Sequence, residues 1–203
     1  MNIDNLRNMN IDNLRKLERD KYESIYVDKN HHYRKKNDAR GYGRCNHGEN
    51  ITPHILSIKP TSVLDIGCGF GNFCDDVQKA GIEKVYGLDI ASVKTGNVIN
   101  NPNIQFIDGE THHLPFEDNS IDIITSFDCL EHCLENDIDI IFSEMHRVVK
   151  NRCVFSIAYR QSREDTAGVI LHMTVKPESW WIEKLNKLFT VEKSDVYLIC
   201  IKR

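Results

Sequence analysis

One nine-residue stretch, Val63–Gly71, constrains the fold of this chain more than any other part of its sequence. Its first four residues are mostly apolar and predict a short buried β-strand. Glycine then occupies every second position, at Gly67, Gly69 and Gly71, and residues Phe70–Ala80 predict a helix. A strand that ends in a glycine loop at a helix N-terminus lets backbone N–H groups approach a ligand closely. The stretch therefore predicts a nucleotide site in an α/β protein.

The spacing of the glycines excludes two common nucleotide loops. The dinucleotide fingerprint G-x-G-x-x-G needs a glycine at position 72, where this chain has Asn72. A phosphate-binding P-loop needs Lys followed by Ser or Thr after its glycines, and neither follows here. Asp65 lies inside the end of the predicted strand, where it could meet an amine of the ligand.

Three more strands are predicted downstream, at Lys84–Asp89, Ile104–Ile107 and Ile121–Ser126. The first of them ends in Asp89, and a carboxylate at this position can accept hydrogen bonds from both ribose hydroxyls of a nucleoside. The last is apolar enough for the centre of a sheet. Between the first two, Ala91–Asn100 predicts a weak helix.

Two segments resemble the class I S-adenosylmethionine-dependent methyltransferases, in particular the small type found in the ubiquinone pathway. The glycine stretch matches their motif I, V-L-D-x-G-x-G-x-G, at every fixed position, and Leu114–Asp122 resembles their L-P-F-x-D-x-S-F-D segment. The resemblance implies an α/β fold: a Rossmann-like three-layer α/β/α sandwich around a seven-stranded, mostly parallel sheet. It also implies the strand order 3-2-1-4-5-7-6, with an antiparallel last strand.

The same resemblance implies S-adenosyl-L-methionine as the methyl donor and S-adenosyl-L-homocysteine as the product. Asp89 would bind the ribose, and Asp108 would accept a hydrogen bond from the adenine amino group. The end of the fourth strand would face the transferred methyl group. The residues expected to contact the cofactor are Asp65, Gly67, Cys68, Gly69, Gly71, Asp89, Ile90, Asp108, Gly109, Ser126 and Phe127.

Asp128, Glu131 and His132 resemble the E-x-x-E-H segment of ubiquinone-pathway O-methyltransferases and small-RNA 2′-O-methyltransferases. In those families the two acids and the histidine hold a divalent metal. Their spacing would place the three side chains on one face of a helix. Asp128 replaces the first Glu and shortens the reach, so we expect no metal here, and a divalent ion is the alternative.

His132 and His172 are the candidate catalytic residues, because either could remove the proton of an acceptor hydroxyl. The alternative for His132 is a structural role in tethering the loop that follows. His172 lies after the predicted fifth strand, Cys153–Tyr159, where related proteins have acceptor-pocket residues, and it is also a candidate metal ligand. Trp180 and Trp181 either line the acceptor pocket or pack in the core.

We expect residues 1–50 to form a helical cover segment and residues 51–203 to form the methyltransferase domain. The chain begins with a near-exact tandem repeat, MNIDNLRN followed by MNIDNLRK. Two copies are too few for a repeat architecture. In related methyltransferases the region equivalent to residues 21–50 covers the cofactor.

Composition limits the partners that this chain can have. A net charge of −4 gives no general attraction to nucleic acid or anionic membranes. Seven cysteines without finger-like spacing or a signal peptide predict reduced thiols, and no apolar run reaches membrane-spanning length. We expect a cytoplasmic enzyme that methylates an oxygen or nitrogen of a small-molecule or glycan acceptor, without nucleic-acid or membrane partners. The alternatives are RNA 2′-O-methylation and non-catalytic binding of the cofactor.

Overall fold

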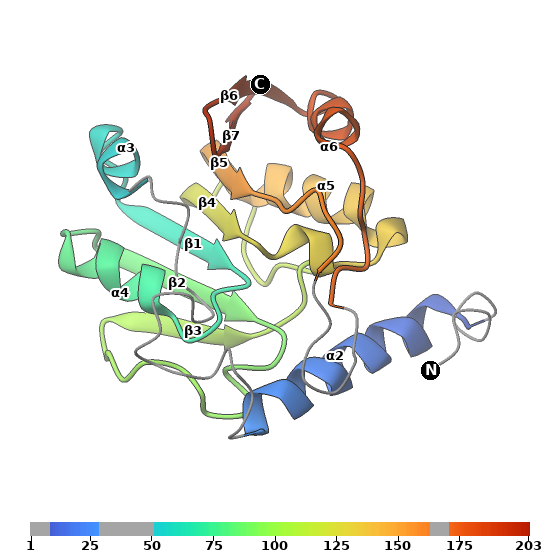
Figure 1. Cartoon of the computed structure of the whole chain (residues 1–203). Helices are drawn as coiled ribbons and strands as arrows, with labels where there is room; N and C mark the ends of the chain where they lie inside the picture. Colours follow the sequence, from blue (N-terminus) through green and yellow to red (C-terminus); the bar gives the residue numbers. More distant parts are fainter. Residues whose placement is uncertain (1–8, 29–50, 163–170) are drawn as a thin grey trace.

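The central sheet has seven strands in the order β3-β2-β1-β4-β5-β7-β6 (Figure 1). The computed structural model describes residues 9–28, 51–162 and 171–203. Strands β1 to β5 run parallel, and β7 is antiparallel to both of its neighbours, which confirms the predicted order and direction. The strands are β1 (Ser62–Ile66), β2 (Lys84–Asp89), β3 (Ile104–Asp108), β4 (Ile121–Phe127), β5 (Val149–Ser156), β6 (Phe189–Lys193) and β7 (Leu198–Lys202).

Helices cover both faces of the sheet and complete the predicted three layers. The covering helices are α3 (Thr52–Ser57), α4 (Asn72–Lys79), α5 (Ile138–Val148) and α6 (Glu178–Leu185). Side chains of β1 pack on both faces of the sheet. Val63 belongs to the core under α3 and α4, whereas Leu64 and Ile66 belong to the core under α5 and α6. Every residue of β1 is buried, as expected for a strand in the middle of a parallel sheet.

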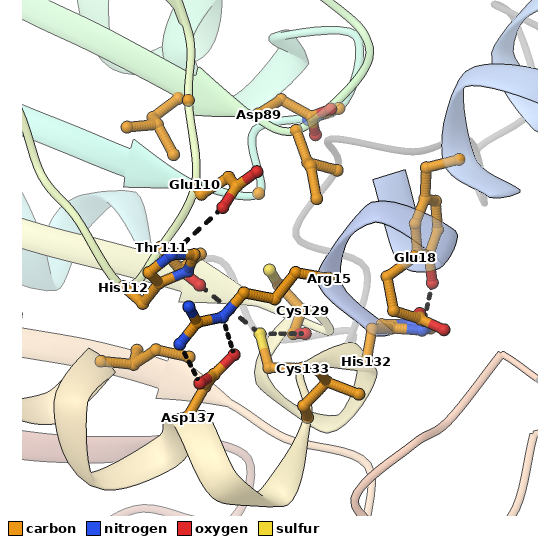
Figure 2. Close-up of a pocket in the computed structure, with 18 of the residues that line it drawn as sticks. Arg15, Glu18, Asp89, Glu110, Thr111, His112, Cys129, His132, Cys133 and Asp137 are labelled. Atoms are coloured by element: carbon orange, nitrogen blue, oxygen red, sulfur yellow. Dashed lines mark hydrogen bonds and ion pairs between the residues drawn. The ribbon is translucent and has the colours of Figure 1, made fainter. Parts of the chain in front are cut away.

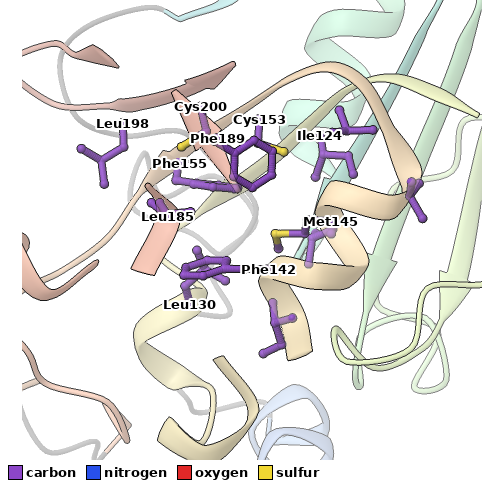
Figure 3. Packing of buried hydrophobic residues seen from close by; sticks show 14 of the residues in the cluster. Ile124, Leu130, Phe142, Met145, Cys153, Phe155, Leu185, Phe189, Leu198 and Cys200 are labelled. Atoms are coloured by element: carbon purple, nitrogen blue, oxygen red, sulfur yellow. The ribbon is translucent and has the colours of Figure 1, made fainter. Parts of the chain in front are cut away.

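Aromatic rings fill the core under α5 and α6 (Figure 3). Phe142 of α5 stacks against Phe155 of β5, with ring centroids 6.2 Å apart, and Leu185 joins from α6. Trp181 is fully buried in this core. Trp180 packs beside it and lies under the ammonium group of a lysine of the same helix. Trp181 therefore packs in the core with Trp180 at its edge, and neither ring lines the two cavities described below.

Two of the predicted elements differ from the structure. Residues Ala91–Asn100 form a series of turns where a helix was predicted. Gly96 adopts a left-handed φ of 68°, and the Thr95 hydroxyl and Asn97 amide bond to nearby carbonyls, so the helical ladder is interrupted. The fifth strand begins at Val149, directly after α5, which is earlier than predicted.

The N-terminal helix α2 (Ile11–Val27) lies beside the carboxyl ends of the strands (Figure 1). Asn10 caps it, since its side chain accepts a hydrogen bond from the Asn13 amide at 2.8 Å. The Tyr26 ring meets Phe70 edge-on, with centroids 5.6 Å apart. Among the described residues, none of the helices combines the length and the apolar character that crossing a bilayer requires.

The predicted division of the chain into residues 1–50 and 51–203 stays a prediction. Residues 29–50, which adjoin the boundary, and the whole first repeat copy, residues 1–8, lie outside the described residues. What the structure describes of the first part is α2 with its flanking residues.

A buried acid at the start of β4 holds the residues at the beginning of β1 by hydrogen bonds. Asp122 accepts hydrogen bonds from the Thr61 amide at 2.8 Å, the Thr61 hydroxyl at 2.7 Å and the Ser62 amide at 3.1 Å. Lys150 donates to its other oxygen at 3.0 Å. These donors hold the pKa of Asp122 well below its usual range, even though partial burial raises it.

We predict that Asp122→Asn lowers the free energy of unfolding by about 1.5–3 kcal/mol, because hydrogen bonds to an ionised acceptor are lost. The pKa of Asp122 is lower in the folded state than in the unfolded state. This contribution is therefore fully present above the unfolded-state pKa, near 3.8, and is lost progressively as the pH falls from there through the lower folded-state pKa. Urea unfolding at pH 7 and pH 3 would measure the effect. Asp118→Asn is the matched control, because that side chain is 71% exposed in its ion pair. Equal stabilities of the two variants at pH 7 would contradict this account of Asp122.

Candidate functional site

A cavity lies where the carboxyl ends of the strands meet α2 (Figure 2). Its walls come from the glycine loop after β1, the ends of β2 and β4, the segment after β3, and two short 3-10 helices, η2 (Leu130–His132) and η3 (Glu135–Asp137). In parallel α/β sheets this edge is where ligands bind. The position of the cavity therefore agrees with the nucleotide site predicted from the glycine spacing.

The glycine loop is shaped by close approaches that only glycine permits. Gly67 has φ of 73°, and a side chain there would overlap the Cys129 thiol. Gly71 has φ of 81°, and a side chain there would overlap the Phe106 ring. The Gly67 amide donates to the Leu88 carbonyl at 2.8 Å, which ties the loop to the end of β2. Gly67 thus faces the cavity, whereas Gly71 begins α4 behind it.

Asp89 sits at the end of β2, where it lines the cavity and organises the backbone around it. One oxygen, Oδ2, accepts from the Gly69 amide at 3.0 Å. The other, Oδ1, accepts from the Ala91 amide at 2.9 Å and the Ser92 amide at 2.8 Å. Burial raises the pKa of Asp89, and the three amides act in the opposite direction. A carboxylate has about four acceptor positions, so one remains for a ligand.

The structure brings only part of the predicted cofactor set to the cavity. The predicted residues that line it are Gly67, Gly69, Asp89, Ile90, Gly109 and Phe127. The predicted residues that do not line it are Asp65, Cys68, Gly71, Asp108 and Ser126. All of the second group except Asp108 are buried beneath the loop or between strands.

The side chains of Asp65 and Ser126 join neighbouring strands. The Thr125 hydroxyl donates to Asp65 Oδ1 at 2.7 Å, and the Ser126 hydroxyl donates to the Ile66 carbonyl at 3.0 Å. Burial raises the pKa of Asp65 to about 7. Cys68 is fully buried and packs in the core under α4. These side chains support the loop from below, and their expected contacts with the cofactor stay predictions.

Asp108 is engaged by the helix that covers the cavity. Arg19 of α2 donates to Asp108 Oδ1 at 3.1 Å, to the Ile90 carbonyl at 2.9 Å and to Glu110 at 3.3 Å. The carboxylate expected to meet an adenine amino group therefore has a partner from within the chain. An adenine at this position would have to share Asp108 with Arg19 or displace it.

Helix α2 supplies cavity residues that the sequence prediction missed. Arg15, Glu18, Tyr22 and Tyr26 line the cavity, and their spacings of three, four and four residues place them on one face of the helix. Arg15 donates to both oxygens of Asp137, at 2.6 and 3.0 Å, and so fixes α2 to η3 (Figure 2). The helical spacing in the sequence groups Arg15 and Glu18 on one face, but it does not show that this face meets the strand ends.

A second cavity adjoins the first and shares Asp128 and His132 with it. Its other walls come from η2, the segment after β5 and the segment before α6. The side chains that give it polar character include Glu131, Tyr159 and His172. Two adjoining cavities with a shared wall can hold two reactants, one on each side of that wall.

The acids and histidines of this wall are arranged differently from the prediction. Asp128 has a left-handed φ of 47°, and η2 begins only after it, so its side chain does not share a helical face with Glu131 and His132. The structure instead brings His172 to those two residues, with one ligand-type atom of each within 4.8 Å of the others. The His132 and His172 rings meet edge-on at 4.8 Å between centroids.

Burial perturbs the titration of two residues in this cluster. It raises the pKa of Glu131 to about 8, with a further increase from the charge of Asp128. It lowers the pKa of His132 to about 4, and the neighbouring His172 acts in the same direction. His132 is therefore a neutral imidazole at physiological pH, with a lone pair available to a ligand.

Comparisons with known proteins agree with the geometry of the site. Residues 64–157 match the family model described as a methyltransferase domain. A sterol 24-C-methyltransferase of Gibberella zeae is 28% identical over 117 residues, which cover 54% of this chain and 30% of that protein. The norajmaline N-methyltransferase of Rauvolfia serpentina is 34% identical over 99 residues, which cover 45% of this chain and 33% of that protein. The chain thus spans about a third of the length of these relatives.

Solved structures of methyltransferases share the fold. The magnesium protoporphyrin IX methyltransferase of Synechocystis, crystallised with bound S-adenosylmethionine, matches with a TM-score of 0.59 at 16% identity, over 75% of this chain and 76% of that one. An S-adenosylmethionine-dependent methyltransferase of Mesorhizobium loti matches with a TM-score of 0.57 at 17% identity, over 77% of this chain and 99% of that one. Residues 64–157 thus match a methyltransferase domain, and the chain is similar in sequence and in fold to S-adenosylmethionine-dependent methyltransferases.

Proposed function

We propose that this chain transfers the methyl group of S-adenosylmethionine to an oxygen or nitrogen of a small-molecule or sugar-containing acceptor. The observation that carries the proposal is the pair of adjoining cavities. The first has the glycine loop and Asp89, which suit a nucleoside, and the second opens on the other side of Asp128 and His132. The six described cysteines are free thiols, which agrees with the reducing cytoplasm that we propose as the location.

The two cavities suit an in-line displacement. With adenosine beside Asp89, the methionine part would extend toward the residues that both cavities share, Asp128 and His132. A lone pair on the acceptor would form the new bond to the methyl carbon as the carbon–sulfur bond breaks, and S-adenosylhomocysteine would leave. The main contribution of the protein would be to align the two reactants and exclude water. Helix α2, fixed by Arg15 to Asp137, would close the first cavity.

We propose His132 and His172 as the residues that act on the acceptor, because both line the second cavity. His132 also lines the first cavity, so it lies beside the place where donor and acceptor would meet. An acceptor hydroxyl must lose a proton during the reaction, and neutral imidazoles can assist that loss directly or indirectly. An amine acceptor could react without such help.

Methyl transfer from tritiated cofactor onto small-molecule, glycan and RNA pools tests the proposed function. We expect label in the small-molecule or glycan pool. Label only in RNA would identify an RNA methyltransferase instead. Tight binding of the cofactor without transfer to any pool would identify a binding protein that lacks the reaction.

We predict that Asp89→Ala weakens the binding of S-adenosylhomocysteine at least about tenfold, because charge-assisted hydrogen bonds to the ribose are lost. Isothermal titration calorimetry would measure the dissociation constant. Asp75→Ala is the matched control: Asp75 is also a buried acid, but it bonds to Lys79 and Asn101 and does not line the cavity. Unchanged affinity in a folded Asp89→Ala protein would refute the ribose role.

We also predict that His172→Ala lowers turnover at least about tenfold while the affinity for S-adenosylhomocysteine stays within about twofold, because His172 faces only the second cavity. Steady-state rates with an acceptor from the labelled pool, together with calorimetry, would separate the two effects. His113→Ala is the control, since His113 is exposed and lines neither cavity. Equal turnover of the two variants would assign His172 to packing.

A further inference from the structure

Two half-buried cysteines, Cys129 and Cys133, line the first cavity and have no part in the proposed reaction (Figure 2). Cys129 lies against the glycine loop, because a Cβ added to Gly67 would be only 2.3 Å from its sulfur. The sulfur of Cys133 is 3.7 Å from the Cys129 carbonyl oxygen and 3.8 Å from the Thr111 hydroxyl. These two side chains, the cavity thiols, therefore share one wall of the first cavity.

The short helix η2 brings the cavity thiols together. The His132 amide donates to the Cys129 carbonyl at 3.0 Å, and the Cys133 amide donates to the Leu130 carbonyl at 3.1 Å. These two bonds fold the chain into a single turn, with Cys129 directly before it and Cys133 directly after it. A disulfide between them would close a loop that contains only the three residues of η2. No distant part of the chain would have to move for that bond to form.

The other four described cysteines differ from the cavity thiols in access. Cys68 and Cys74 lie in the core under α4, and Cys153 of β5 is paired with Cys200 of β7 in the antiparallel register. All four are fully buried, and none of them lines either cavity. Cysteine oxidation follows exposure, so a small oxidant dissolved in water meets the cavity thiols first among the described cysteines.

The surroundings of the two cavity thiols make them unequal. Hydrogen bonding with the Cys129 thiol lowers the pKa of Cys133, and the Thr111 hydroxyl acts in the same direction against the effect of burial. Hydrogen bonding with Cys133 raises the pKa of Cys129, and burial adds to that increase. The thiolate is the reactive form of cysteine. Cys133 is therefore the thiol that reacts first, and Cys129 lies beside it as the second.

We propose that Cys129 and Cys133 form an oxidation site, where a peroxide converts the two thiols into a reversible disulfide that weakens cofactor binding. The Cys133 thiolate attacks one oxygen of hydrogen peroxide, so an S–O bond forms and the O–O bond breaks. The hydroxide that leaves takes up the proton that Cys133 had released. The Cys129 sulfur then attacks the sulfenic acid, the S–S bond forms, the S–O bond breaks and water leaves. Two thiols are oxidised, one peroxide is reduced, and two waters form.

The disulfide would change both sides of the site. It would draw the Cys129 sulfur toward Cys133 and so alter the contact of Cys129 with Gly67 in the glycine loop. It would also constrain η2, which carries His132 into both cavities. Disulfides of cytosolic proteins are usually transient, so we expect a thiol reductant to reverse this one. The effect on the cofactor rests on the proposed function, whereas formation of the disulfide does not.

Peroxide treatment of the full chain, followed by mass spectrometry, tests for the disulfide. Cys45 lies outside the described residues, so a Cys45→Ser background removes its contribution. We expect the peptide that contains both cavity thiols to lose two hydrogens, to resist alkylation and to recover with dithiothreitol. The four buried cysteines are the internal control: they should stay reduced, and they should react with an alkylating reagent only after the protein is unfolded.

Serine variants separate a reacting pair from a single reactive thiol. In Cys129→Ser the oxidation of Cys133 has no second thiol to follow, so the sulfenic acid should persist and be trapped by dimedone. In Cys133→Ser the remaining thiol should take up dimedone at least about tenfold more slowly, because it stays protonated. Serine is close in size to cysteine, and either variant alone distinguishes the two cases if the other fails to fold.

Calorimetry with S-adenosylhomocysteine measures the consequence for binding. We expect the oxidised protein to bind at least about tenfold more weakly than the reduced protein, because the wall that holds the ligand is no longer preorganised. Dithiothreitol should restore the affinity. Cys133→Ser treated with peroxide is the matched control, and its affinity should equal that of the untreated variant.

Cavity thiols that stay reduced in excess peroxide would overturn the proposal, and so would oxidation that begins at the buried cysteines. A disulfide that leaves the affinity for S-adenosylhomocysteine unchanged would also overturn it. The same samples keep this proposal apart from the proposed function. Binding of S-adenosylhomocysteine without any disulfide would refute the oxidation site alone. A disulfide in a chain that binds no S-adenosylhomocysteine in either state would support the oxidation site and refute the proposed function.

Discussion

The nucleoside side of the site depends on one carboxylate, that of Asp89. Its two oxygens accept from the amides of Gly69, Ala91 and Ser92, so it joins the glycine loop to the turn after β2. Together with the Gly67 amide, which donates to the Leu88 carbonyl, these contacts hold the loop against the end of β2. The same carboxylate lines the cavity where we propose that a ribose lies. Asp89 thus both holds the glycine loop in place and is the group that we propose to bind the ribose.

Local signals in the sequence predicted the central strands and the glycine loop, whereas the strand order came from the resemblance to a known family. The strand–glycine–helix pattern after Val63 and the acid at Asp89 both lie within single elements, where periodicity and spacing are informative. Spacing does not reveal which way the Asp65 side chain points, and its contact with the cofactor stays a prediction. The side chain accepts a hydrogen bond from Thr125 of the neighbouring strand, a contact that depends on the pairing of β1 with β4.

The opposite wall of the site could not be predicted in the same way. Arg15 and Glu18 reach the cavity because α2 docks beside the strand ends, and docking depends on partners such as Asp137 that lie far along the chain. The cluster of Glu131 with His172 is likewise tertiary. Reading Asp128 and its neighbours as one helical face failed because the chain turns through a left-handed residue before a 3-10 helix begins.

The central claim is that the first cavity holds the donor and the second holds the acceptor. A crystal structure of the full chain with S-adenosylhomocysteine tests it most directly. We expect one ribose hydroxyl on the remaining acceptor position of Asp89 and the sulfur facing Asp128 and His132, toward the second cavity. A sulfur that points away from that wall, or an adenosine bound elsewhere with the cavity beside Asp89 filled by protein, would contradict it.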